Sequence, residues 1–168
     1  MRFATFAPAL TAALLAAGCA AATASGPVPA TTAATPAWDS ASFTMSSWGQ
    51  PVTSWTVNAD GSGTWSRSTP QGGNFMDRTT TTRALPADAA AATALAATLA
   101  RLPATAPSGD DCKERITDQP YGALTITTGA RVQEYRYNAG CLDRAYVRFI
   151  NVLREADGQV ARRGEAAG

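Results

Sequence analysis

Short runs that alternate between apolar and polar residues predict β-strands in the middle of the chain. Residues 43–46 alternate between apolar and hydroxyl side chains, and the turn signal Gly49-Gln50-Pro51 ends this run. The polar, β-branched residues 75–83 are typical of a strand that has one face in water.

A β-hairpin is predicted around Asp60-Gly61, which separates two short segments rich in aromatic and β-branched residues. If the loop has three residues and ends at Gly61, Trp55 lies opposite Trp65, and such aromatic cross-strand pairs stabilise sheets. A two-residue turn would instead place Trp55 opposite Ser66. The register of this hairpin stays open at this point.

A second hairpin is predicted where residues 121–127 and 131–137 flank Thr128-Gly129-Ala130. Tyr135 and Tyr137 share one face of the second strand, and alternation favours Arg136 on the wet face.

Two helices are predicted from apolar residues at helical spacing. Residues 86–102 are mostly alanine and leucine, with three leucines at i, i+4 and i+7 and prolines at both ends. Residues 142–155 form the clearest amphipathic pattern in the chain. Gly158 is expected to end this helix, and residues 159–168 are expected to fray.

The order of these elements, ββββ-α-ββ-α, predicts an α+β fold in which two helices pack on one face of an antiparallel sheet. Residues 38–164 have the length of a single domain, followed by a disordered tail at 165–168. Residues 20–37 contain only small residues, threonine and proline besides one valine, so they cannot bury enough apolar area to fold. They predict a flexible tether.

The first nineteen residues have the pattern of an export signal. Arg2 supplies a positive charge, residues 3–17 form an apolar run too short to span a bilayer, and Gly18 precedes Cys19.

The stretch Leu15-Ala16-Ala17-Gly18-Cys19 resembles the lipobox of bacterial lipoproteins, with the leucine one place earlier than usual. The resemblance implies that residues 1–18 are removed, that Cys19 carries a diacylglycerol, and that the protein is anchored in the envelope and faces the periplasm. Ala20 in place of aspartate favours the outer membrane. Cleavage after Ala22-Thr23-Ala24 is the alternative, and it would release a soluble periplasmic protein. The signal, tether and small domain together are similar to the layout of many uncharacterised bacterial lipoproteins.

With Cys19 lipidated, Cys112 and Cys141 remain as a pair in an oxidising compartment, which predicts a disulfide. The bridge would close a loop of 29 residues (141 minus 112) and contribute roughly 3 to 4 kcal/mol. The sequence has no histidine, so two widely spaced cysteines lack the ligands of a structural zinc site. No metal or cofactor is expected.

Composition excludes several classes of function. The net charge of +1 gives no electrostatic case for nucleic acid. The absence of histidine removes the usual general base of hydrolases. Lys113 is the only lysine and lies in a charged segment, while Glu134 with Asp118 or Asp143 could form a carboxylate pair that acts on glycosides.

Aromatic residues supply the candidate binding surface. Trp55 and Trp65 suit the core, whereas other aromatic residues and one arginine could form an exposed surface for a glycan or peptide: these are Trp38, Trp48, Tyr121, Tyr135, Arg136 and Tyr137. Residues 58–62 faintly resemble a calcium loop, but the downstream glutamate is missing and a hairpin turn explains them.

We therefore expect a monomeric, non-enzymatic envelope domain that binds a protein, peptide or glycan. The first alternative is a small periplasmic inhibitor of an envelope hydrolase, which would insert the disulfide-braced loop 103–118 into a cleft. The second alternative is a carboxylate-dependent hydrolase.

Overall fold

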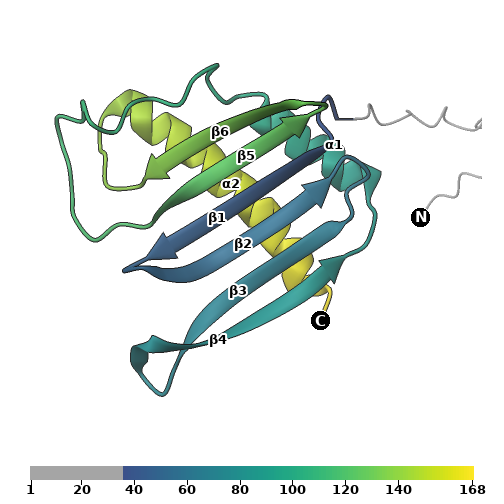
Figure 1. Cartoon of the computed structure of the whole chain (residues 1–168), viewed down its shortest axis with the longest axis horizontal. Coiled ribbons are helices and arrows are strands. Elements are labelled where there is room, and N and C mark those ends of the chain that lie inside the picture. Colours follow the sequence, from purple (N-terminus) through teal and green to yellow (C-terminus); the bar gives the residue numbers. More distant parts are fainter. Residues whose placement is uncertain (1–35) are drawn as a thin grey trace, which may run out of the picture. The chain divides into compact units, whose positions relative to one another are not determined.

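The computed structural model describes residues 36–168. The predicted signal peptide, Cys19 and nearly all of the predicted tether lie outside the described residues. From residue 36 onward the elements are β1 (Ser40–Ser47), β2 (Gln50–Asn58), β3 (Gly63–Gln71), β4 (Asn74–Leu85), α1 (Ala89–Leu99), β5 (Tyr121–Thr128), β6 (Arg131–Asn138) and α2 (Arg144–Ala166) (Figure 1). The predicted α+β class and element order are confirmed.

The strands form one antiparallel sheet of order β4-β3-β2-β1-β5-β6. β1 lies inside the sheet, where Phe43 is opposite Trp55 of β2 on one side and Leu124 of β5 on the other. The long-range β1–β5 pairing therefore joins an N-terminal four-stranded meander to the C-terminal hairpin.

Both helices lie behind the same face of the sheet in Figure 1, and the aromatic core fills the space between them and the strands. Phe43 stacks on Trp55, with ring centroids 5.5 Å apart, and on Tyr137 at 5.6 Å. Trp55 lies directly opposite Trp65. The loop between them has three residues and ends at Gly61, whose φ is +83°. Of the two registers that the sequence left open, the structure therefore adopts the one with the three-residue loop.

Helix α1 is shorter than the predicted span 86–102. It begins after Asp88, whose carboxylate accepts a hydrogen bond from the backbone N–H of Ala91 at 2.9 Å. An aspartate in this position satisfies one of the free N–H groups of the first turn, so the helix begins at Ala89, three residues after Pro86. Leu95 and Leu99 are buried in the core, as their spacing predicts.

Helix α2 overturns one prediction from the sequence. It continues through Gly158 to Ala166, so residues 159–166 are helical and do not form a frayed tail. Val160, Ala161 and Gly164 are buried and extend the apolar face of the helix beyond the glycine. Burial of this face outweighs the modest helix propensity that one glycine costs. No helix within residues 36–168 is both long enough and apolar enough to cross a membrane.

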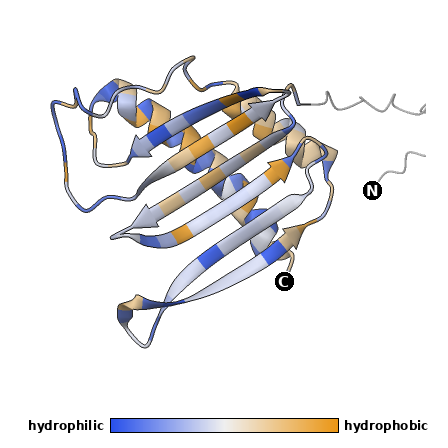
Figure 2. Ribbon diagram, viewed as in Figure 1, coloured by the Kyte–Doolittle hydropathy of each residue, from blue (hydrophilic) through white to orange (hydrophobic). Residues whose placement is uncertain are grey.

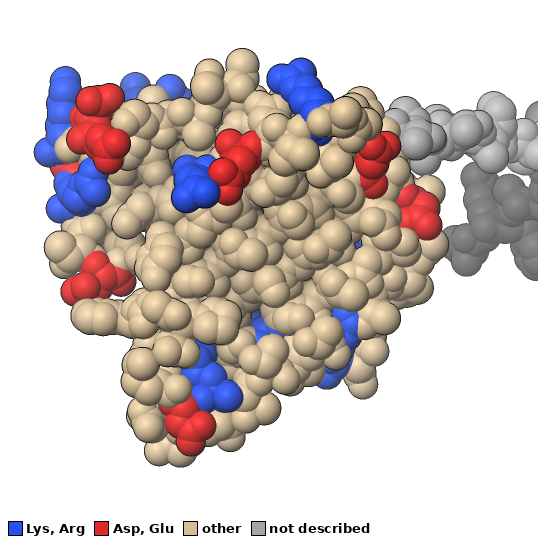
Figure 3. Space-filling view, viewed as in Figure 1, with Lys and Arg blue, Asp and Glu red and all other residues tan. Residues whose placement is uncertain are grey.

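The other face of the sheet is not covered by a helix, and small hydroxyl side chains cover most of it. Figure 2 shows pale strands of intermediate hydropathy, and Figure 3 shows few charged groups over the same face. The strand register assigns to this face Ser42, Thr44, Ser54, Thr56, Thr64, Ser66, Ser68, Thr80, Thr82, Thr125 and Thr127. Neighbouring strands pair some of these hydroxyls, as in the 2.8 Å contact between Ser66 and Thr82. The open face is therefore polar but almost uncharged.

Candidate functional site

Trp48 forms the tip of the turn between β1 and β2 and is the most unusual aromatic residue in the structure. It has a φ of +51°, and Gly49 beside it has a φ of +76°. Two successive residues with positive φ are what a two-residue type I′ hairpin requires, and Asn-Gly is the sequence that this turn favours. A tryptophan with positive φ is strained. Its side chain is nevertheless 64 % exposed, whereas Trp38, Trp55 and Trp65 are buried.

Tyr121, the first residue of β5, holds this turn in place. Its hydroxyl oxygen accepts a hydrogen bond from the backbone N–H of Gly49 at 3.1 Å. The ring of Tyr121 remains 39 % exposed. The bond therefore fixes the position of the turn without burying either aromatic side chain.

Residues 115–119, in the loop between α1 and β5, face Trp48 and Tyr121 across a hollow and form its other wall. The predicted disulfide between Cys112 and Cys141 is confirmed and ties this loop to the segment before α2. The backbone N–H of Ile116 donates to the carbonyl of Gly140 at 2.9 Å, and that of Leu142 donates to Glu114 at 2.8 Å.

Asp143 adds a third connection to this loop. Its carboxylate oxygens accept from the backbone N–H groups of Lys113 and Glu114, at 3.1 and 3.3 Å. The wall is therefore held by covalent, backbone and side-chain contacts, although it lies in a long loop.

A hollow of about 360 Å³ lies between this wall and the turn, and we call it the Trp48 pocket. Its lining residues are Trp48, Arg115, Ile116, Thr117, Asp118, Gln119, Tyr121 and Asn138. Among residues 36–168, the non-glycine residues with positive φ are Trp48 and Asp118, whose φ is +60°, and both line this pocket. Ile116 is 44 % exposed, so three exposed large apolar or aromatic side chains meet here. Strained residues tend to cluster where a structure binds or reacts.

The structure divides the six predicted surface residues into two groups. Trp48, Tyr121 and Arg136 are exposed, whereas Trp38, Tyr135 and Tyr137 are buried. The interpretation of the latter three as surface residues is therefore wrong.

The buried tyrosines on β6 have structural partners. The hydroxyl of Tyr135 donates to the carbonyl of Pro103 at 3.0 Å, and that of Tyr137 donates to Thr44 at 3.2 Å. Burial raises the pKa of both phenols. Arg136 points to the opposite, open face and pairs with Glu134 at 3.0 Å, as strand alternation predicts.

The three carboxylates considered for glycoside chemistry have separate surroundings. Glu134 pairs with Arg136 on the open sheet face, Asp143 binds loop amides, and Asp118 lines the Trp48 pocket. Asp143 also lies with the sulfur atoms of Cys112 and Cys141, all within 4.8 Å of one another. Because the two sulfurs form a disulfide, neither is a thiolate that could bind a metal.

Residues 58–62 form the predicted hairpin turn. Oδ1 of Asp60 accepts from the backbone N–H of Ser62 at 2.8 Å and from its hydroxyl at 2.7 Å. These hydrogen bonds lower the pKa of the exposed Asp60 carboxyl. This carboxylate oxygen is therefore used within the turn itself.

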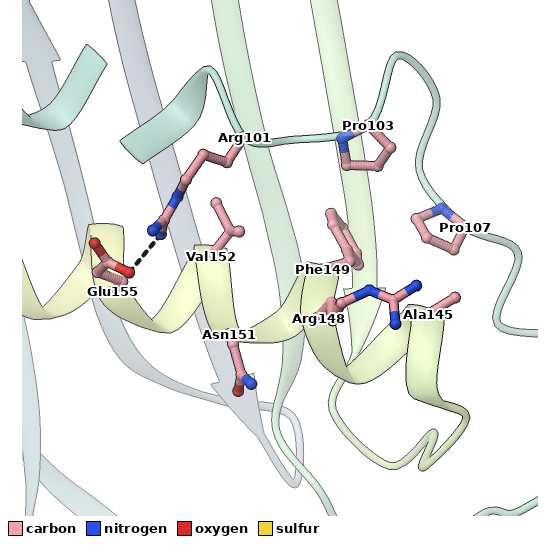
Figure 4. A pocket seen from close by; sticks show the side chains of 9 residues that line it. All are labelled: Arg101, Pro103, Pro107, Ala145, Arg148, Phe149, Asn151, Val152 and Glu155. Atoms are coloured by element: carbon pink, nitrogen blue, oxygen red, sulfur yellow. Dashed lines mark hydrogen bonds and ion pairs between the residues drawn. The ribbon is translucent and has the colours of Figure 1, made fainter. Parts of the chain in front are cut away.

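Larger hollows than the Trp48 pocket exist within residues 36–168, among them those of about 560 and 590 Å³. Figure 4 shows the first of these, a groove between α2 and the segment that follows α1. An ion pair between Arg101 and Glu155 crosses one end of the groove and lowers the pKa of Glu155. Phe149 is the aromatic residue in its lining, and it is buried. The Trp48 pocket is preferred because of its exposed aromatic side chains, and not because of its volume.

Sequence reasoning found Trp48 and Tyr121, and it named the disulfide-braced loop 103–118, but it did not place that loop beside the two aromatic residues. Ile116, Gln119 and Asn138 were not singled out, because each is an ordinary residue whose neighbours lie far away in sequence. One feature of the sequence could have indicated this wall. The segment between Cys112 and the strand that begins at Tyr121 is polar, and the predicted disulfide would hold it near the sheet.

Comparison with known proteins gives no relative, since no family model, curated protein or solved structure matches the chain. The fold and the pocket thus define a small, disulfide-braced α+β domain with exposed aromatic side chains at one end of its sheet.

Proposed function

We propose that this protein is a non-enzymatic binding domain of the bacterial cell envelope, and that its ligand, a protein, peptide or glycan, contacts the Trp48 pocket. The observation that carries the proposal is the exposed Trp48 in a strained turn conformation. An exposed aromatic side chain fixed beside a polar hollow is a typical anchor for a ligand. A purely structural turn would gain stability from asparagine at this position.

The location is part of the same proposal. The lipobox-like residues before Cys19 support attachment by a lipid, with the domain facing the periplasm and the outer membrane favoured. The Cys112–Cys141 bridge supports a compartment in which thiols oxidise. Release as a soluble periplasmic protein after Ala24 is the alternative.

The location is tested by mass spectrometry of the mature N-terminus. We expect a diacylated Cys19 in the wild-type protein and loss of membrane attachment in Cys19→Ser. A mature protein that begins at Ser25 would support the soluble alternative, and an uncleaved Met1 would contradict export.

The binding function is tested by capture from envelope extracts with the mature full-length chain and two variants. Trp48→Asn removes the aromatic ring but suits the turn, so the protein should still fold. Val132→Ala is the matched control, because Val132 is also 64 % exposed and lies near the start of β6, whereas the pocket contains Asn138 at its end. We expect Trp48→Asn to lose the captured ligand and Val132→Ala to keep it. Equal capture by both variants would contradict the proposal.

A second candidate function is inhibition of an envelope hydrolase by the braced loop. The supporting observation is Ile116, which is 44 % exposed on a loop that the disulfide and the Asp143 contacts hold rigid. A rigid loop with an apolar side chain can enter a cleft at low entropic cost. Inhibition of peptidoglycan hydrolysis by wild-type protein, abolished by Ile116→Asp but kept in Trp48→Asn, would favour this candidate.

A further inference from the structure

The aromatic surface of the Trp48 pocket limits the kinds of ligand that it suits. The exposed face of an indole carries negative charge density, and it attracts the weakly positive C–H groups that line one face of a sugar ring. Trp48 offers such a surface at 64 % exposure, with Tyr121 fixed beside it by the 3.1 Å hydrogen bond to Gly49. Because this hydrogen bond holds the backbone of the turn, little loop entropy remains to be lost when a ring stacks there.

The polar wall of the pocket favours a neutral ligand. Arg115 and Asp118 contribute one charge of each sign, and Thr117, Gln119 and Asn138 contribute hydroxyl and amide groups. Amides and hydroxyls both donate and accept hydrogen bonds, which matches a ligand whose own groups do the same. The lining carries no excess charge that would select an anion or a cation.

The position of the pocket argues against an extended peptide. Peptides that bind by strand addition need an exposed sheet edge, and the edges of this sheet are β4 and β6. Trp48 follows β1 and Tyr121 begins β5, and both of these strands lie inside the sheet. Asn138 is the last residue of the edge strand β6, so the pocket touches this edge only where the strand ends. The volume of about 360 Å³ suits a small ring-shaped ligand or the end of a chain of such rings.

We infer that the Trp48 pocket is a binding site for a neutral saccharide, a conclusion that rests on the proposed binding function. One sugar ring stacks on Trp48, and its hydroxyls face the wall formed by residues 115–119 and Asn138. The tryptophan is held outward by its position at the tip of the hairpin, between the last residue of β1 and the first of β2, where it is 64 % exposed.

The first experiment uses the mature full-length protein on an array of neutral oligosaccharides and their carboxylated or sulfated counterparts. We expect binding to at least one neutral saccharide, with little change when the salt concentration is raised. Binding to anionic saccharides alone, or to none on the array, would overturn the inference.

The second experiment locates the bound saccharide by fluorescence. Trp38, Trp55 and Trp65 are buried, so acrylamide should quench mainly Trp48. Titration with the neutral saccharide identified on the array should protect this fluorescence. Affinity should fall at least about tenfold in Trp48→Asn, fall less in Trp48→Tyr, and change by less than about twofold in Val132→Ala. Protection that persists in all variants, or equal affinity of Trp48→Asn, would place the saccharide elsewhere.

The two proposals fail differently. If no neutral saccharide binds but a protein is captured in a Trp48-dependent manner, the saccharide inference is wrong and the binding function stands. If Trp48→Asn captures the same material as the wild type, both are wrong. Near-ultraviolet circular dichroism of Trp48→Asn shows whether the core is intact, so a folding defect is not mistaken for either result.

Discussion

At the scale of single residues, Trp48 exposes an aromatic ring at the cost of a strained turn that makes the folded protein less stable. Its φ of +51° is a conformation that asparagine adopts readily and tryptophan does not. We expect Trp48→Asn to raise the free energy of unfolding by about 1 kcal/mol, because Asn-Gly is the favoured type I′ sequence. Urea denaturation monitored by circular dichroism measures the change. A clear loss of stability would mean that the indole packs on the pocket wall as a structural contact.

Two glycines of α2 should respond oppositely to the same substitution. A Cβ at Gly164 would lie 2.3 Å from Cδ2 of Trp65, whereas at Gly158 the nearest atom is Nη1 of Arg162 at 3.5 Å. Gly164→Ala should cost about 1–3 kcal/mol through overpacking. Gly158→Ala should add about 0.5–1 kcal/mol through helix propensity. Thermal and urea unfolding of both variants test the packing of α2 on β3, and changes of the same sign would contradict it.

The buried carboxyl of Asp157 should make the free energy of unfolding depend on pH. Burial raises the pKa of its carboxyl, while the indole N–H of Trp55, which donates to Oδ1 at 3.1 Å, opposes the rise. A raised folded-state pKa means that this group favours folding when protonated, and that its contribution is lost as pH rises through the folded pKa. Asp157→Asn keeps an acceptor for Trp55 and removes the charge. It should stabilise the protein near pH 7, and the gain should vanish below about pH 4.

The pH effect is measured by urea titration of wild type and Asp157→Asn at both pH values, because the difference between the two proteins cancels the other titrating groups. An equal difference at both values would show that the substitution acts through packing and not through the buried charge.

At the scale of elements, the last two turns of α2 should be essential to the fold. Val160 and Ala161 are buried, and Nη2 of Arg163 donates to the carbonyls of Gly61 at 2.9 Å and Pro86 at 2.8 Å. Removal of residues 159–168 should therefore cost roughly 3 kcal/mol or more. Removal of Ala167 and Gly168 alone, beyond the end of the helix, is the control. If both truncations had the same small effect in chemical denaturation, the C-terminal turns would not be docked.

The elements predicted correctly are those fixed by local chemistry. The hairpin at Asp60-Gly61 was predicted, whereas its register was left open between two loop lengths, and the three-residue loop that ends at Gly61 decides it within a dozen residues. The end of α2 was missed because Gly158 is a local signal for a helix end, whereas burial of Val160 and Gly164 is a tertiary effect. Gly164 is buried against Trp65, about a hundred residues earlier in the chain.

At the scale of the whole molecule, the candidate site could be predicted only in part. Trp48 and Tyr121 were singled out as aromatic residues that could form a binding surface, but the strand order that brings β1 beside β5 does not follow from local patterns. Trp38 was misplaced for the same reason, since it joins a core cluster with Leu95 and Leu99 of α1. Contacts between residues far apart in the sequence therefore decide which of the predicted surface aromatic residues are exposed in the folded protein.

The open face of the sheet gives a prediction for the molecule as a whole. A sheet face left without helices would self-associate if it were apolar, and here serine and threonine hydroxyls keep it wet. Thr56, Thr64 and Thr82 face outward and are exposed. Their joint replacement by valine keeps the shape and strand propensity of each side chain but removes the hydroxyls.

We therefore expect the wild-type domain to sediment as a monomer and the triple valine variant to associate in a concentration-dependent way, as measured by analytical ultracentrifugation. The corresponding triple serine variant, which keeps the hydroxyls, should stay monomeric. The control matters because serine has the lower strand propensity, so association caused by loosened strands would be strongest in the serine variant. Association of the serine variant, or a monomeric valine variant, would mean that this face does not depend on its hydroxyls to remain uncovered.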